Sequence, residues 1–452
     1  MQRKIAQIKS LISYKRILAI SAPIMLGSAA QNVVALTDSV FLYYVSEVDF
    51  AAIGFVGVFY LIIAAIGYGF SKGAQIFVAR MQGKGDSQGV RRHFQTSLIL
   101  ELLLSTLLFF LVYNYAGYIF SWFVQSENIM ERSLNYIQWR IWGIWFGYLG
   151  IALVSFYTGL ARTKFILVDT VILATVNIFF NYSLIFGKFD LPQMGIAGAG
   201  LASTLSEIVA FVAFVLYMLW DKELKPLQLM TWRGFDWGIF LSQIKLSMPI
   251  VVHLLVGLGS WFIFFSIVEN IGAHALAISN LARMVYLCLS IPVWGYSSAI
   301  NTLVSSYIGE GRKSDILPLI WKTGRLALWS VLLFALPVLL FPHFFLYPLL
   351  GSASPGLIDD AKPVLVVVGV ILFFMAVASV FFNGLTGTGA TRFGLWVQLV
   401  NAVIYTVLIY SVVNHWQLSL VWAWSVEIIY WLLTLIVSIW YITSERWHRI
   451  EL

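Results

Sequence analysis

The chain has few charged residues and a single cysteine. Charged residues make up 11% of its 452 residues, against about 25% in an average soluble domain. So little charge cannot cover a water-facing surface, which excludes a soluble multidomain enzyme and a disordered protein. Cys288 alone forms neither a disulfide framework nor a cysteine-based metal site. Because 60% of the residues are apolar, the sequence predicts an integral membrane protein.

The motifs of membrane enzymes are also missing. No helix carries a His-Glu-x-x-His pattern, and no glycine-rich loop ends in the lysine of a nucleotide-binding site. The six histidines are far apart in sequence. We therefore expect neither enzymatic activity nor a cofactor.

Long apolar stretches predict the architecture. A membrane-spanning helix needs about 20 mostly apolar residues, and polar segments separate twelve such stretches here. The ten-residue alternating segments of a β-barrel are not seen. We predict an all-α membrane protein with helices near residues 17–45, 50–80, 92–122, 132–160, 165–187, 195–220, 243–268, 275–308, 320–350, 361–388, 392–413 and 418–444.

The distribution of lysine and arginine predicts the orientation. With the N-terminus inside the cell, 22 of the 28 basic residues fall on the cytoplasmic side, as expected for cytoplasmic loops. The formal charge of +7 then reflects topology rather than nucleic-acid binding. We expect a monomer in lipid, in the bacterial cytoplasmic (inner) membrane, with both termini cytoplasmic.

The chain contains an internal repeat of six helices. At an offset of 226 residues, Ser21-Ala-Pro23-Ile24 aligns with Ser247-Met-Pro249-Ile250, and Tyr60 aligns with Tyr286. Later matches follow after small gaps, among them Gly159 with Gly387 and Glu207 with Glu427. Six spans are an even number, so the halves insert with the same orientation, related by a pseudo-twofold axis along the membrane normal around a central cavity. The predicted lobes are 1–225 and 243–452, joined by a cytoplasmic linker, 226–242.

Several motifs then resemble one transporter family. A proline-containing first helix, Gly-x-Gly turns at 83–85 and 309–311, and the run Gly-Leu-Thr-Gly-Thr-Gly-Ala-Thr-Arg at 384–392 resemble multidrug and toxic compound extrusion (MATE) transporters. Leu36-Thr-Asp38-Ser, with Tyr136 and Arg140, resembles the DinF-like branch. The resemblance implies antiport of amphipathic, often cationic, organic compounds against Na⁺ or H⁺.

The chain departs from that family pattern in two places. The DinF pattern has an aspartate four residues after an asparagine, whereas this chain has Asn177 and Asn181. The acids of helices 7 and 10 in the NorM branch are absent as well. The coupling ion, H⁺ or Na⁺, therefore stays open.

Asp38 is the leading candidate for the coupling site. An ionisable side chain inside a span is costly and usually faces a partner or a water-filled cavity. Gln31 lies seven residues earlier on the same helix face. A desolvated carboxylate in this position can take up and release a proton, although a purely structural hydrogen bond to a neighbouring helix is the alternative.

Other polar residues within the spans are candidates to support Asp38. Asn177 and Asn181 lie one turn apart, as do Ser203 and Glu207, and their oxygens suit either Na⁺ near Asp38 or a proton-linked network. Polar contacts that merely hold helices together are the alternative. Three further assignments concern helix 4 and the second half. We expect Tyr136 to donate to Asp38, and Arg140 to neutralise an acid or to anchor at the membrane surface. Glu427 is expected to share a structural role with its repeat relative Glu207.

The mechanism expected from these residues places a hinge at Pro23, which lacks a backbone donor. Charging or neutralising Asp38 then changes the hydrogen bonding of the first helix and expels substrate. A flippase for lipid-linked oligosaccharides or lipids, from the same broad superfamily, is the alternative. The acids in the first-half spans outnumber the bases, which disfavours a pyrophosphate-binding cavity.

Overall fold

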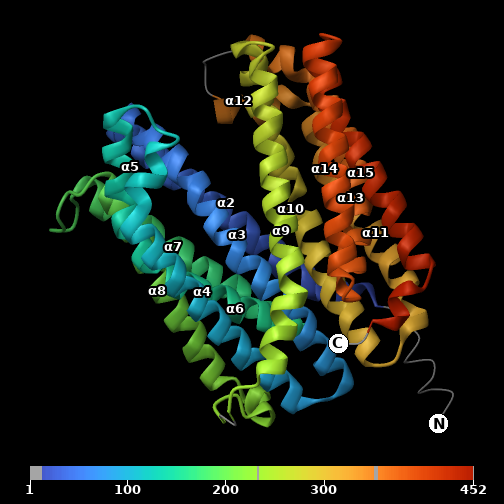
Figure 1. Cartoon of the computed structure of the whole chain (residues 1–452). Coiled ribbons are helices and arrows are strands. Elements are labelled where there is room, and N and C mark those ends of the chain that lie inside the picture. Colours follow the sequence, from blue (N-terminus) through green and yellow to red (C-terminus); the bar gives the residue numbers. More distant parts are fainter. Residues whose placement is uncertain (1–12, 232–233, 351–354, 451–452) are drawn as a thin grey trace. The chain divides into compact units, whose positions relative to one another are not determined.

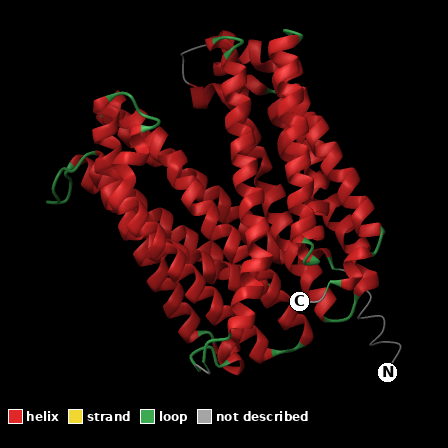
Figure 2. Cartoon of the chain, in the orientation of Figure 1, coloured by secondary structure: helices red, strands yellow, loops and turns green. Residues whose placement is uncertain are grey.

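The computed structural model describes residues 13–231, 234–350 and 355–450, and these are helical apart from short loops (Figure 2). Twelve of their helices are long and apolar enough to cross a membrane. The predicted all-α class and the number of spans are therefore confirmed.

The first half of the chain contains six spans, the fourth built from two helices (Figure 1). A 3₁₀ turn, Ile141–Gly143, separates α5 from α6. The helices are α2 (Tyr14–Val45), α3 (Glu47–Lys84), α4 (Ser87–Ser121), α5 (Glu127–Arg140), α6 (Ile144–Gly159), α7 (Lys164–Phe186) and α8 (Ile196–Trp220).

The second half repeats this order of spans, but its break follows α11 in the third span, and the fourth span, α13, is continuous. The helices are α9 (Trp237–Glu269), α10 (Ala273–Gly309), α11 (Ile316–Leu340), α12 (Pro342–Leu350), α13 (Pro355–Gly387), α14 (Thr391–Tyr410) and α15 (Leu420–Thr443). The prediction of one helix over 320–350 was wrong, because α11 ends at Leu340. Pro342 has no amide hydrogen and disfavours a helical conformation at Phe341, whose φ of −128° lies outside the helix.

Helix ends in the two halves follow the same local chemistry. Gly85 closes α3 in the left-handed conformation, with a φ of 73°, and Gly311 adopts a φ of 76° after α10. These are the third residues of the two repeat-related Gly-x-Gly turns. Glycine is suited to both positions because it has no Cβ to clash there.

Backbone contacts divide the chain into two compact units, and both boundaries fall inside helices. One unit is Leu26–Val251, and the other combines the segment up to Met25 with the segment from Val252 onward. The divisions lie two residues after Pro23 in α2 and two residues after Pro249 in α9. The beginning of each half's first helix therefore groups with the other half, rather than with its own lobe as the linker position suggests.

Repeat-related glycines allow the close contacts that hold each unit together. A Cβ on Gly159 would lie 3.0 Å from the Gln75 carbonyl oxygen, and one on Gly387 would lie 2.6 Å from that of Asn301. In the same way, Gly69 lies against Val251 and Gly295 against Met25. Gln75 and Asn301, and likewise Met25 and Val251, are 226 residues apart, so the duplicated sequence forms duplicated contacts.

Candidate functional site

A row of hydrogen-bonded side chains connects α2 to α7 in the Leu26–Val251 unit. The Asn181 amide donates from Nδ2 to Asp38 Oδ1 and also to Asn177 Oδ1, the latter at 2.8 Å. Asn177 Nδ2 continues the row to Ser203 Oγ on α8, at 3.3 Å. Both asparagines are fully buried, whereas Asp38 is half-buried. The row thus leads from a partly accessible carboxylate into the interior of the unit.

Tyr136 contacts the Ser203 end of this row and not the Asp38 end. Its side chain hydrogen-bonds to Ser203 and interacts electrostatically with Asp38. We predicted a direct hydrogen bond from Tyr136 to Asp38, but the hydroxyl is held by Ser203. The connection between the two residues therefore passes through the asparagine row.

An ion pair between α5 and α8 lies beside the row. Arg140 Nη1 donates to Glu207 Oε2 at 2.8 Å, and Nη2 donates to Glu207 Oε1. The guanidinium also lies over the Tyr60 ring, 3.8 Å from its centroid, a favourable arrangement for a cation. Side-chain exposures of 9% for Arg140 and 16% for Glu207 place this pair in a low-dielectric environment. Arg140 therefore neutralises an acid, and that acid is Glu207.

The local fold makes room for this pair. The Gly143 backbone lies so close that an added Cβ would be 2.6 Å from Glu207 Oε2 and 2.8 Å from Arg140 Nη1. Close to the 3₁₀ turn, Thr204 Oγ1 donates to the carbonyl oxygens of Trp139 and Arg140. Carbonyl groups near a helix break need such a partner inside a membrane protein. The absence of a side chain on Gly143 therefore leaves room for the ion pair, and Thr204 satisfies the carbonyl groups next to the turn.

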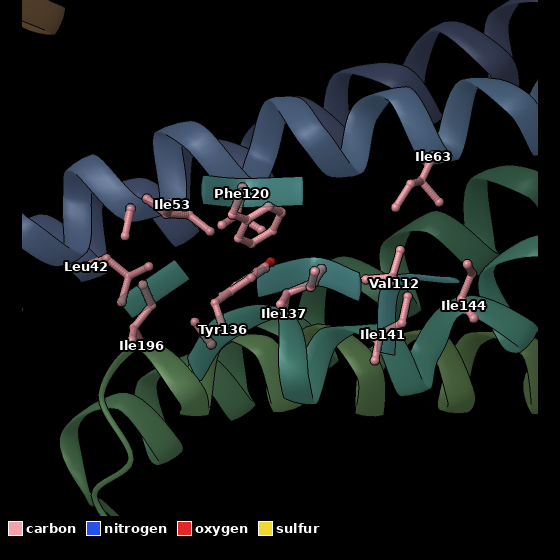
Figure 3. Packing of buried hydrophobic residues seen from close by; sticks show 14 of the residues in the cluster. Leu42, Ile53, Ile63, Val112, Phe120, Tyr136, Ile137, Ile141, Ile144 and Ile196 are labelled. Carbon is pink, nitrogen blue, oxygen red and sulfur yellow. The ribbon is translucent and has the colours of Figure 1, made fainter. Parts of the chain in front are cut away.

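Apolar side chains surround the polar network. Leu42, one turn after Asp38, belongs to the same buried cluster as Tyr136 and Ile137 (Figure 3). Ile196 and Ala199, at the start of α8, complete the packing next to Ser203. A charge on Asp38 is thus less well solvated than one in water, which makes its neutralisation by a bound cation favourable.

The charges of the site sum to one unpaired negative charge. The charges of Arg140 and Glu207 neutralise each other in their ion pair. Asp38 interacts electrostatically with Arg140 but forms no salt bridge among the described residues. Asn181 turns its Nδ2 toward Asp38, and its Oδ1 is buried without a hydrogen-bond partner among the described residues. Within the described ranges, no three acids, histidines or cysteines gather as ligands for a multivalent metal. This donor set fits a proton or one Na⁺.

The structure brings most of the predicted residues together. Seven of them form the row and the ion pair: Asp38, Asn177, Asn181, Tyr136, Arg140, Ser203 and Glu207. Gln31 is exposed, and α2 passes through Pro23 without interruption. Glu427 belongs to the other unit and has different surroundings.

Three contributing residues escaped the sequence analysis: Tyr60, Gly143 and Thr204. For Tyr60 a signal was present, since it is one of the aromatic residues that the internal repeat preserves. No sequence pattern indicated the roles of Gly143 and Thr204, because these roles depend on where α8 packs against α5.

A family model described as MatE matches residues 23–183 and 249–411, which are the bodies of the two repeats. The protein is similar to a relative described as "Probable multidrug resistance protein NorM" from Thermotoga maritima, 25% identical over 423 residues, with 91% of this chain and 88% of that protein covered. It is also similar to "Multidrug resistance protein MdtK" from Klebsiella pneumoniae subsp. pneumoniae, 25% identical over 68% of this chain and 67% of that protein.

Solved structures share the fold. One, described as the outward-facing conformation of a multidrug resistance MATE family transporter of the MOP superfamily, superposes with a TM-score of 0.88. Its sequence identity is 18%, and the match covers 96% of each chain. The likeness bears out the two-lobed, twelve-span prediction. The assignment to a DinF-like branch stays a prediction.

Proposed function

Since the chain belongs to the MatE family of membrane transporters, we propose that it is a secondary antiporter that exports amphipathic, mainly cationic, organic compounds in exchange for H⁺ or Na⁺. The family places it among transporters and not enzymes. Relatives named for multidrug resistance support the substrate class. The ion exchange is supported by the site around Asp38.

The proposed location is a bacterial cytoplasmic membrane, with both termini in the cytoplasm. Most basic residues then lie on the cytoplasmic side, as the positive-inside rule requires. In this orientation Asp38, seven residues before the end of α2 at Val45, lies in the outer half of the membrane. A cation from outside therefore has the shorter path to it.

The observation that carries the proposal is the position of Asp38 at the open end of a buried amide row. Asn181 holds one carboxylate oxygen and, through Asn177, connects it to Ser203. The adjacent Arg140–Glu207 pair is already balanced. One monovalent cation at Asp38 thus neutralises the site, so the affinity of the site for that cation can differ between two states of the transporter.

In the proposed cycle, the residues of the row transmit the charge state of Asp38. Binding of a proton or Na⁺ weakens the attraction of Asp38 for the Asn181 amide, which loosens the contact between α2 and α7. Tyr136 and Ser203 hold the inner end of the row in place. Pro23 leaves α2 with a missing amide donor, so α2 can bend there and the drug is released outward.

The test is transport into everted membrane vesicles, with H⁺ and Na⁺ gradients imposed separately and a small panel of fluorescent organic cations. Asp38→Asn keeps the shape of the side chain and removes its charge. We expect the initial rate of gradient-driven drug uptake to fall at least about tenfold, or about 1.4 kcal/mol. The gradient that drives wild-type uptake identifies the coupling ion.

Glu131→Gln is the matched control, since Glu131 is an exposed acid on α5, the helix of Tyr136 and Arg140. It should transport like the wild type. Full uptake by Asp38→Asn would refute the proposed coupling site. Absence of drug movement under either gradient in the wild type would instead favour the flippase alternative.

A further inference from the structure

Glu427 on α15 is a buried acid that the site around Asp38 does not use. The residue is 7% exposed and lies eight positions into the helix, in the unit that contains the second half. Its carboxyl group hydrogen-bonds to the Tyr405 hydroxyl of α14. It also interacts electrostatically with Tyr286 of α10 and Tyr430 of α15. The Trp431 indole N–H is a second hydrogen-bonding group at the carboxyl, so the immediate polar surroundings of Glu427 are phenol groups and one indole, all of them uncharged.

The internal repeat provides a direct comparison for this residue. Glu207 aligns with Glu427, and Tyr60 aligns with Tyr286. In the first half, the Arg140 guanidinium donates hydrogen bonds to the acid and lies over the ring of the tyrosine. In the second half, the corresponding helix α13 has no basic residue between Lys362 and Arg392. The second copy of the site therefore has the acid and the tyrosine without a cation on this helix.

Charged and titratable groups on the helices around Glu427 are engaged elsewhere. On α10, the Arg283 guanidinium lies over the Phe265 ring, and on α9, His253 stacks against Phe382. Near the start of α13, Asp359 pairs with Lys362 and His343, and Asp360 pairs with His274. Arg392 is the second residue of α14. Within the described residues, only Tyr286, Tyr405 and Tyr430 are titratable groups that face the Glu427 carboxyl.

Close packing around the carboxyl leaves little space for a bound ion. Tyr286, Tyr405 and Trp424 are at most 4% exposed, and the Phe264 ring packs on both Tyr405 and Trp424. Tyr430 is fixed by donating its hydroxyl to Gln398 Oε1 at 2.6 Å. A sodium ion requires several oxygen ligands and room between them, whereas a proton requires only one carboxylate oxygen.

We propose that Glu427 is a second proton-binding site, located in the second-half unit and separate from the Asp38 site. The carboxyl binds one proton from water as a neutral acid, because a buried carboxylate without a counter-charge is costly. When the proton leaves to water, the Tyr405 hydroxyl donates to the carboxylate that remains. No other bond forms or breaks in this step. The inference concerns proton binding alone and does not depend on the exported substrate.

The experiment is infrared spectroscopy of the purified, full-length protein in lipid, recorded across a pH series. A protonated carboxyl has a C=O absorption that a carboxylate lacks. The difference between wild type and Glu427→Gln should show the loss of one such component. Glu427→Asp should retain it at a shifted frequency, and Tyr405→Phe should shift it without loss, since a hydrogen bond to the acid is removed.

Asp38→Asn separates this inference from the proposed function. If Glu427 is a proton site, its component persists in Asp38→Asn and disappears when Glu427→Gln is added. If Asp38→Asn removes every protonated-carboxyl component, the inference is overturned while the Asp38 mechanism stands. An unchanged spectrum in a folded Glu427→Gln protein overturns it too. If that variant does not fold, Tyr405→Phe decides, because an unshifted band excludes the proposed pairing.

Discussion

The two repeat-related acids, Glu207 and Glu427, lie on equivalent helices in different electrostatic surroundings. Glu207 forms a bidentate ion pair with Arg140, whereas Glu427 faces tyrosines. The backbone contacts of the two halves, in contrast, match closely: Gly159 approaches Gln75 as Gly387 approaches Asn301. Duplication has preserved the scaffold, and the charges have diverged on it. Substitutions of the charged residues should therefore have different effects in the two halves. Substitutions of the equivalent glycines should have similar effects on stability in both.

The largest effect is expected from removing the cation of the first half. Arg140→Met leaves Glu207 as an uncompensated buried charge, which should cost about 3–5 kcal/mol. Glu427→Gln removes an acid that has no cationic partner and should change stability by less than about 1 kcal/mol. Thermal unfolding of the purified proteins in detergent measures both.

The double variant Arg140→Met with Glu207→Met provides the control, since it removes both charges and should recover much of the lost stability. Equal destabilisation by Arg140→Met and Glu427→Gln would contradict the proposed asymmetry between the halves.

A smaller effect, shared by the two halves, is expected from their equivalent glycines. Gly159→Ala and Gly387→Ala each place a Cβ within 3.0 Å of a backbone oxygen, and backbone cannot move aside cheaply. Each should destabilise the protein by about 1–3 kcal/mol. Thermal unfolding again measures this, with Gly54→Ala as the control because its Cβ would meet no atom within 4 Å. A large difference between the two variants would show that the halves do not share this contact.

The smallest effect concerns ion selectivity in the first half. Asn181→Asp adds a second carboxylate next to Asp38 and should strengthen Na⁺ activation of drug uptake by roughly tenfold, or about 1.4 kcal/mol. The measurement is the Na⁺ concentration that gives half-maximal uptake in everted vesicles. In the second half, Asn401→Asp on α14 serves as the comparison. The Asn401 amide donates to Thr434 Oγ1, away from Asp38, so this change should leave the Na⁺ dependence unchanged. Unaltered Na⁺ activation in Asn181→Asp would argue against ion binding at that position.

The sequence predicted the span count and the polar members of the site for simple reasons. An apolar run of about 20 residues spans a bilayer as an α-helix. Polar residues within such runs are rare, so they are easily recognised. The partners of those residues were less accessible. Arg140 and Glu207 are 67 residues apart, and their pairing depends on how α5 and α8 rotate against each other. The helix breaks at Ile141–Gly143 and at Phe341 shift side chains in ways that hydropathy does not encode.

Because the start of α2 groups with the second half of the chain, its packing is completed only late in biosynthesis. Ser21 and Met25 leave the ribosome early, but their packing partner Gly295 lies on α10 and is translated much later. Until α10 has been synthesised, the face of the first helix that carries Ser21 and Met25 lacks this packing partner. A nascent chain arrested after α8 should therefore expose that face to quality-control proteases, and co-expression of the missing half should protect it.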